Sequence, residues 1–190
     1  MKEMIADLPS DVQSRVAPLL ADPTFGYRRF TPATLGSDTD LSNCFGTTVF
    51  CLNIEDTILA AIHTKPRTYS KDRSFRAIWS QAKGADRPGY VDDVLLGVAL
   101  QDQTRFATVP TACPGDLVVI TLDDNPNHAG IALGVHNRRE RIFHQRKYGG
   151  PFEISTLEEY RKFRDWRTLP PCTAYRVLER KIEIPSILEC

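Results

Sequence analysis

Hydrophobic and polar positions divide this chain into a helical first part and a strand-rich second part. Near the N-terminus, the pattern of residues 11–22 (DVQSRVAPLLAD) predicts a short helix that Ser10 can cap and that Pro18 bends or ends. Apolar residues then recur at helical spacing between residues 45 and 62, so we expect the longest helix there. Polar residues 40–43 precede this run and form a credible cap region.

The second part alternates short apolar runs with turn residues, which is typical of strands. An extended piece and a short helix capped at Ser155 or Thr156 precede the last strand. The predicted strands are PGDLVVITL (114–122), HAGIALGVH (128–136), RIFHQRK (141–147) and CTAYRVLERKIEI (172–184), with HNRRE as the turn of a hairpin. Helices followed by an antiparallel meander predict the α+β class.

The segments between these elements are less regular. Residues 22–43 are rich in Pro, Gly, Ser, Thr and Asp and are expected to be loop, as is the polar stretch 63–72. A second helix is predicted over 74–83, ended by Gly84, whereas 91–110 fits a helix and a strand equally.

Composition and charge narrow the class of protein. A chain of 190 residues predicts one domain (1–190) with a real hydrophobic core, and a formal net charge of zero argues against nucleic-acid binding. No run approaches the roughly 18 apolar residues of a membrane span. The N-terminus has no apolar core of a signal peptide, so we expect synthesis in the cytoplasm without a Sec signal and no membrane partner.

The cysteines and arginines limit the chemistry further. The chain has an odd number of cysteines and no CxxC motif, which argues against a disulfide framework and a structural zinc site. We therefore expect reduced thiols and neither a metal nor a cofactor. A disulfide between Cys172 and Cys190 remains an open alternative. One dense basic cluster is either a solvated hairpin or a contact for an anionic substrate: Arg138, Arg139, Arg141, Arg146 and Lys147.

Cys44 is the candidate nucleophile. It lies where a polar segment turns into the apolar helix, and a helix N-terminus favours the reactive thiolate. Its backbone N–H could also face the oxyanion formed in acyl transfer. The alternative is a small buried thiol in the core, which is the interpretation that we favour for Cys51, two turns further along. Cys113, before Pro114 and Gly115, is interpreted as a turn residue.

His128 is the candidate general base, because it begins an apolar strand and small residues beside it, Ala129 and Gly130, allow close approach of another element. The alternative is an ordinary turn histidine. His144 lies on the strand expected to pair with it, so the two rings can meet and His144 can orient His128. Gln145 points to the other face of a regular strand.

These pieces in this order resemble the NlpC family of papain-like cysteine hydrolases, in its unpermuted branch with the cysteine before the histidine. The resemblance rests on Asn43-Cys44, Pro114 to Val118, His128 to Gly134 and Phe143-His144. It implies a papain-like domain with helices packed on an antiparallel sheet. It also implies that Cys44 is the nucleophile, His128 the base and His144 the orienting third residue.

Several positions depart from the family pattern. Asn43 stands where an aspartate is usual and Phe45 where a serine is usual, and Tyr27 is only a loose match to the tyrosine that donates to the oxyanion. Residues 63–112 are longer than the family's connection and can be an insertion, a lid or a specificity wall.

The resemblance implies hydrolysis of an amide bond in a peptidoglycan peptide. Without a Sec signal, we expect export by a dedicated secretion system, as for an antibacterial effector with an immunity protein, or release to the cell wall of a target. Deamidation or acyl transfer on a protein by the same residues, and a catalytically inactive binding module, remain the alternatives. His63 and His136 are interpreted as solvent-facing turn residues.

Overall fold

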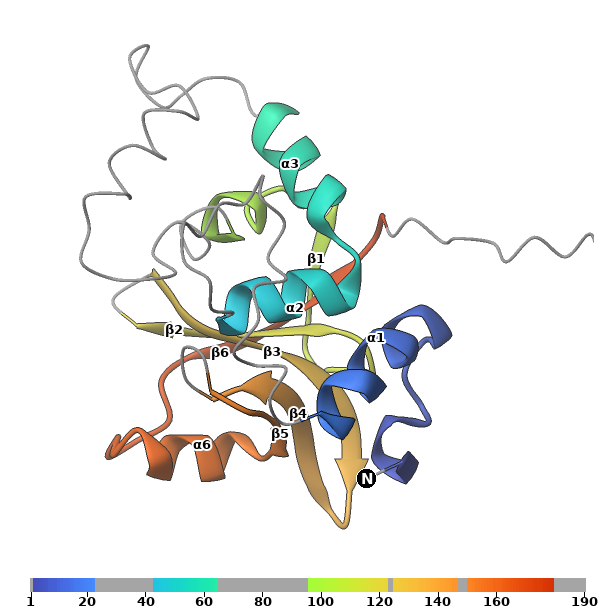
Figure 1. Ribbon diagram of the computed structural model, residues 1–190. Helices are drawn as coiled ribbons and strands as arrows, with labels where there is room; N and C mark the ends of the chain where they lie inside the picture. The colour runs from blue at the N-terminus through green and yellow to red at the C-terminus, as the bar shows by residue number, and fades with distance from the viewer. Residues whose placement is uncertain (1, 23–42, 65–95, 123–124, 147–149, 180–190) are drawn as a thin grey trace, which may run out of the picture.

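An antiparallel sheet forms the centre of the protein and carries helices on both faces (Figure 1). The computed structural model describes residues 2–22, 43–64, 96–122, 125–146 and 150–179. The mixed helix and strand content confirms the α+β expectation at the level of class. The chain belongs to a layered arrangement in which one sheet separates two apolar clusters.

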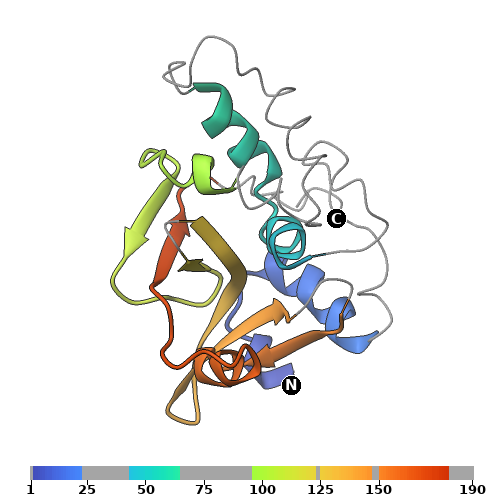
Figure 2. The same cartoon turned by 90° about the vertical axis from the view of Figure 1, so that its left-hand side faces the viewer.

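The sheet has six strands in the order β1-β6-β2-β3-β4-β5. Strands β2 to β5 follow one another as the predicted meander, and the C-terminal strand β6 pairs between β1 and β2. Figure 2 shows β1 and β6 turned steeply relative to β4 and β5, the twist expected of such a sheet. The strands are β1 Phe106–Val109, β2 Leu117–Leu122, β3 Asn125–His136, β4 Arg139–Gln145, β5 Phe152–Ser155 and β6 Cys172–Val177.

The hairpin between β3 and β4 is tighter than the predicted five-residue turn. Asn137 and Arg138 both have positive φ, of 52° and 63°, as a two-residue hairpin turn requires. His136 is therefore the last residue of β3 and not part of the turn. His63 also lies in regular structure, inside a helix, so its assignment to a turn was wrong.

The first helix, α1 (Ser10–Ala21), follows a short 3-10 turn, η1 (Lys2–Ile5), and differs from the prediction at both ends. Pro9 occupies the cap position and no side chain caps the helix, so Ser10 is its first residue. Pro18 lies inside the helix and does not end it, because its carbonyl still accepts the N–H of Asp22. Pro18 has no N–H to donate to the carbonyl of Ser14, so α1 continues to Ala21 without that one hydrogen bond.

The long helix expected over 45–62 is in fact two helices, α2 (Cys44–Leu52) and α3 (Glu55–Thr64). Asn53 adopts the left-handed conformation (φ 54°) and ends α2, a role that Asn fills well because its short polar side chain tolerates that region. The apolar pattern runs through this break because both helices bury residues in the same core. The hydrophobic periodicity therefore concealed the end of α2.

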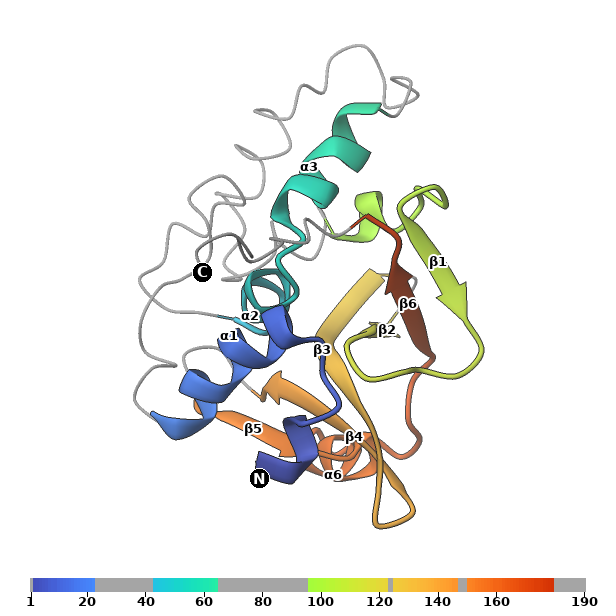
Figure 3. The same ribbon diagram turned by 90° about the vertical axis from the view of Figure 1, so that its right-hand side faces the viewer.

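The two faces of the sheet bury different side chains. The face that we call the inner face packs under α1, α2 and α3, and its large apolar residues include Leu117, Ile131 and Phe143. The opposite, outer face carries a smaller cluster of Val118, Ala132 and Ile142. The short helix α6 (Leu157–Phe163) covers part of that face, on the other side of the sheet from α2 (Figure 3).

The PGDLV motif at the start of β2 has a structural role that explains its aspartate. The buried Asp116 accepts two hydrogen bonds from Arg176 of β6, at 3.0 and 3.2 Å, and one from the backbone of Cys113 at 2.8 Å. These contacts close the turn predicted at Cys113 and join β2 to β6. Gly115, with φ of 88°, is needed there because L side chains rarely adopt that conformation.

Several expectations concern residues outside the described ranges. They include the predicted helix 74–83, nearly all of the loop 22–43 with Tyr27, most of 63–112, and the residues Lys147 and Cys190. Of the ambiguous stretch 91–110, residues 96–99 are helical and Phe106–Val109 form β1. None of the helices in the described part of the chain is long and apolar enough to cross a membrane.

Candidate active site

Cys44 is the first residue of α2, as predicted. Asn43 caps the helix: its side-chain Oδ1 accepts the N–H of Gly46 at 2.8 Å and its carbonyl accepts the N–H of Thr47 at 2.9 Å. Asn43 therefore provides the cap expected in residues 40–43. Cys44 is partly exposed, and the positive end of the α2 dipole lies at its position.

His128 and His144 meet on the outer face, the contact that the sequence allowed if the register of the two strands permitted it. Nε2 of His128 lies 2.8 Å from Nδ1 of His144, and the two rings are perpendicular with centroids 4.9 Å apart. Both side chains are almost completely buried, at 2% and 0% exposure. A β-bulge in the β2–β3 pairing lies immediately before His128, and such bulges commonly re-aim a side chain next to a functional site.

Gly130 makes room for this pair. A Cβ at Gly130 would lie 3.0 Å from the carbonyl oxygen of Phe143 and 3.3 Å from Cβ of His144. These distances are closer than ordinary contact, so a larger residue would push β4 away from β3. The sequence argument that small residues beside His128 allow close approach is confirmed at Gly130.

Tyr160 from α6 completes the cluster and was not predicted as a site residue. Its ring stacks on His128, with centroids 4.0 Å apart and planes 18° apart, and meets His144 edge-on at 5.3 Å. Burial raises the pKa of the Tyr160 hydroxyl, and the negative charge of a Cys44 thiolate raises it further, whereas Arg164 and Arg146 oppose both effects. The sulfur of Cys44 is thus within electrostatic range of this hydroxyl.

Burial also controls the charge of His128. Removal from water lowers its pKa well below the usual 6.5, and the charges of His144 and Arg164 lower it further. A neutral imidazole at neutral pH is the form that can accept a proton. His128 is therefore in the protonation state that a general base needs.

A buried hydrogen bond connects α2 with β4 beside the histidines. The hydroxyl of Thr47 donates to Oε1 of Gln145 at 3.0 Å, and Nε2 of Gln145 donates to the carbonyl of Gly150 at 2.8 Å. Gln145 faces α2 while its neighbour His144 faces α6, so the expectation that Gln145 points away from the histidines is confirmed. The bond fixes the first turns of α2 relative to the strand that carries His144.

The other described cysteines differ from Cys44 in their surroundings. Cys51 is fully buried in the inner core, as predicted, and burial raises its thiol pKa far above the usual value. Loss of water around the Cys172 sulfur, together with the charge of Glu140, raises its pKa to about 11. Cys113 is exposed in the turn before β2. The free thiols among the described residues therefore include two that resist ionisation at neutral pH.

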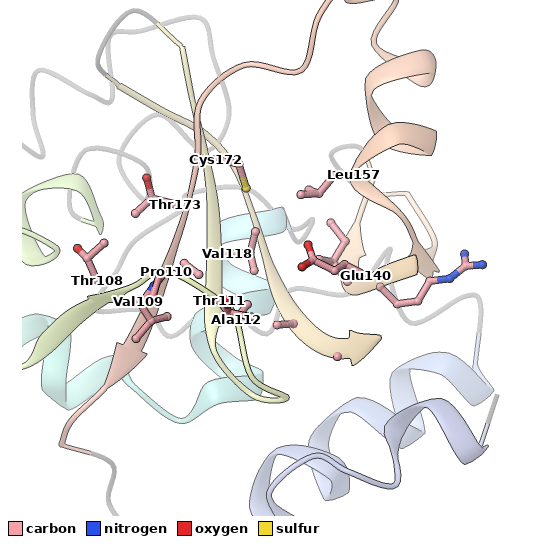
Figure 4. Close-up of a pocket in the computed structure, with 15 residues that line it drawn as sticks. Thr108, Val109, Pro110, Thr111, Ala112, Val118, Glu140, Leu157, Cys172 and Thr173 are labelled. Atoms are coloured by element: carbon pink, nitrogen blue, oxygen red, sulfur yellow. The ribbon is translucent and has the colours of Figure 1, made fainter. Parts of the chain in front are cut away.

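Cys172 borders a cavity of about 400 Å³ on the outer face, shown in Figure 4. Its walls come from β1, β2, β3, β4, β6 and the start of α6, and they include Val118, Ala132, Ile142 and Leu157. The histidine pair does not line this cavity. The cavity is therefore separate from the histidine pair, although both lie on the outer face of the sheet.

The basic cluster on the β3–β4 hairpin is partly neutralised. Arg141 bonds to Glu159 at 3.2 Å, and Arg146 pairs with Glu153 while its guanidinium lies over the Phe163 ring at 4.9 Å. Arg138 and Arg139 are exposed at the turn. Most of the described cluster is therefore better interpreted as the solvated hairpin. Among the described residues, no group of three or more His, Cys, Asp and Glu side chains is arranged to hold a metal ion.

Comparison of the chain with protein-family models, with curated proteins and with solved structures gave no match. The candidate site is therefore defined by its geometry alone. It consists of His128 and His144 on adjacent strands and of Tyr160 of α6, which stacks on His128. Cys44, at the start of α2, is linked to this cluster through its electrostatic effect on Tyr160. Tyr160 had one signal in the sequence: in LEEYRKF it is the buried aromatic among charged residues of a short helix.

Proposed function

We propose that this protein is a cysteine hydrolase that cleaves an amide bond, with Cys44 as nucleophile, His128 as general base and His144 as the residue that orients the base. The observation that carries the proposal is the buried hydrogen bond between His128 and His144. Two imidazoles at 2% and 0% exposure are unusual in a core, because burial disfavours their charged forms. A buried histidine whose pKa is strongly lowered is typical of functional sites, and the partly exposed thiol of Cys44 acts electrostatically on Tyr160, the residue stacked on that histidine.

The first half of the reaction forms an acyl-enzyme. Nδ1 of His128 takes the proton of the Cys44 thiol while the sulfur attacks the substrate carbonyl carbon and its π electrons move to oxygen. The oxyanion collapses, the C–N bond breaks, and the imidazolium of His128 donates its proton to the departing amine. His144 accepts the Nε2–H of His128 and so stabilises the imidazolium in between.

The second half releases the acid. A water molecule gives a proton to His128 and its oxygen attacks the thioester carbon, after which the C–S bond breaks and Cys44 regains the proton. The backbone N–H of Cys44 at the positive end of α2 is the proposed donor to the oxyanion in both halves. The Tyr160 hydroxyl, which its raised pKa keeps protonated and which lies beside Arg164, is a second candidate donor to the same oxyanion.

The resemblance to NlpC-type hydrolases suggests a peptidoglycan peptide as substrate, and this is the experiment to begin with. Purified cell-wall peptidoglycan is incubated with the protein, and new amine ends and released fragments are measured by mass spectrometry. We expect new ends with the native protein and a loss of more than about 10³-fold with Cys44→Ala or His128→Ala, because members of such a unit are individually indispensable. Cys113→Ala, which removes an exposed thiol elsewhere, is the matched control.

Other products would change the conclusion in defined ways. A one-dalton gain on glutamine residues of a co-incubated protein would identify a deamidase, and an acyl adduct would identify a transferase. If Cys44 reacts with iodoacetamide at pH 6 no faster than a free thiol, and Cys44→Ala has no effect on any of these products, the domain is an inactive binding module and the hydrolase proposal is wrong.

A further inference from the structure

A second pair of side chains lies behind the histidines, on strand β5. Nε2 of His144 is 2.7 Å from Oγ of Ser155 and 3.2 Å from Oε1 of Glu153. Glu153 is the register partner of His144 across the β4–β5 pairing, and Ser155 is two residues further on the same face of the strand. The contacts therefore form a continuous chain from β5 through His144 to His128.

Both partners of Nε2 accept a hydrogen bond there. Burial alone would raise the pKa of Glu153, but hydrogen bonds and charge from His144 and Arg146 outweigh it and bring the pKa below the usual 4.5, so its carboxylate has no proton to donate. The Ser155 hydroxyl donates its own proton to the carbonyl of Thr156, at 3.2 Å, and offers its lone pairs to the ring. A neutral His144 must then carry its proton on Nε2.

The tautomer of His144 determines the tautomer of His128 through the short contact between the two rings. If Nε2 of His144 carries the proton, Nδ1 is a bare acceptor, and at 2.8 Å the Nε2 of His128 must donate to it. The proton of neutral His128 is thereby placed on Nε2, which leaves the lone pair on Nδ1. That is the nitrogen that the proposed reaction uses to take the thiol proton.

We propose that Glu153 and Ser155 are positioning residues that fix the tautomers of both histidines, so that Nδ1 of His128 is the basic nitrogen. This inference rests on the proposed function for its chemical meaning. The tautomers themselves are a property of the folded protein without substrate, so they can be measured separately. Tyr160 contributes to the same end, because its stacked ring holds the plane of His128 while β5 determines where the proton lies.

The direct test is nitrogen-15 NMR of the histidine rings at pH 7.5. In the native protein we expect a protonated Nε2 and an unprotonated Nδ1 on both His128 and His144. In Glu153→Ala/Ser155→Ala, His144 should populate both tautomers, and His128 should follow it. Glu158→Ala/Ser14→Ala, which removes an exposed carboxylate and an exposed hydroxyl away from the histidines, should leave both rings unchanged.

A second readout is the rate at which Cys44 is alkylated at pH 7, measured by mass spectrometry with Cys113 as the internal reference. We expect a fall of at least about tenfold in Glu153→Ala/Ser155→Ala, since loss of tautomer control in a comparable triad reduces the rate by up to about 10⁴-fold. Arg146→Ala, which removes the other partner of Glu153, should change the rate much less.

The results separate this inference from the proposed function. A native protein in which His144 is protonated on both nitrogens or on Nδ1, or a double variant with unchanged tautomers, would overturn the positioning role even if the enzyme cleaves amides. An equal fall in Arg146→Ala with native tautomers would overturn it too. Conversely, the expected tautomers in a protein whose Cys44→Ala variant retains full activity would refute only the hydrolase.

Discussion

The two faces of the sheet share the same strands but bury different kinds of side chain. The inner face is filled by large apolar side chains from three helices, which maximise the area removed from water. The outer face carries a smaller apolar cluster and a group of imidazoles, a phenol, a carboxylate and a hydroxyl. The inner face is organised for stability, and the polar group on the outer face is an arrangement that stability alone would not favour.

Adjacent residues on β4 give the largest contrast. Phe143 is fully buried in the inner core, and Phe143→Ala should lower the free energy of unfolding by about 3–5 kcal/mol because it leaves a cavity. His144→Ala should cost about 1–3 kcal/mol, but it should reduce hydrolysis roughly 100-fold while leaving residual activity, because orientation is only part of the base's work.

Urea denaturation and turnover of the same two variants measure this contrast. The native protein and Cys51→Ala, a core change that touches neither histidine, bracket the stability scale. If His144→Ala were as destabilising as Phe143→Ala with turnover unchanged, the outer cluster would be ordinary core and the distinction between the faces would fail.

Gly130 determines how closely β4 approaches β3 beside the histidine pair, because a side chain there would meet the backbone of Phe143 and Cβ of His144. Gly130→Ala should cost about 1–3 kcal/mol, as expected for overpacking, and should lengthen the His128–His144 contact, so that turnover falls about tenfold or more. Leu19→Val in α1 is a destabilised control remote from the histidines. Turnover that follows stability equally in both variants would remove the special role assigned to this glycine.

The sequence predicted the meander and the pairing of β3 with β4, because period-two alternation marks the strands. It allowed contact between His128 and His144 only if the register permitted, and the two-residue turn that determines this register was not predicted. It failed at Asn53, where helical periodicity continues across the end of α2, and at Ser10, where a good capping residue lies one position inside the helix. The backbone conformation determines which residue caps a helix, and the residue type only makes that conformation more or less favourable.

The remaining site residues could not be predicted from the sequence, for a different reason. Glu153 and Ser155 meet His144 only through the register of β4 with β5, and Tyr160 reaches His128 only because α6 packs on the outer face. Such contacts depend on the tertiary arrangement of segments whose local patterns are ordinary. A charged residue such as Glu153, in a segment predicted only to be extended, is far more often a solvent-exposed side chain than one that orients a buried ring.

The two helix starts allow a smaller test of the same comparison. Asn43→Ala should lower stability by about 1 kcal/mol because the N–H of Gly46 loses its acceptor, and it should slow alkylation of Cys44 by loosening the first turn. Ser10→Ala should change stability by less than about 0.5 kcal/mol, since no side chain caps α1. Thermal denaturation of both variants measures the two losses of stability, and equal losses would show that the Asn43 side chain does not stabilise the start of α2.

The last prediction concerns acid stability, and it arises from the outer face alone. Because the pKa of His128 in the folded protein lies well below 6.5, the unfolded chain binds a proton below pH 6.5 that the native state does not. The free energy of unfolding should therefore be highest above about pH 6.5 and should decrease as the pH falls toward the folded pKa, by up to about 1.4 kcal/mol per pH unit for this group. Glu153 contributes to stability in a separate pH range, because its lowered pKa provides stability that is lost only below about pH 4.5.

Urea denaturation between pH 7.5 and 5 separates the contribution of His128 from that of Glu153. His128→Gln should flatten the slope and His136→Gln, at the end of β3, should not; a native slope retained in His128→Gln would mean that this buried imidazole takes up its proton as readily in the folded protein as in the unfolded chain.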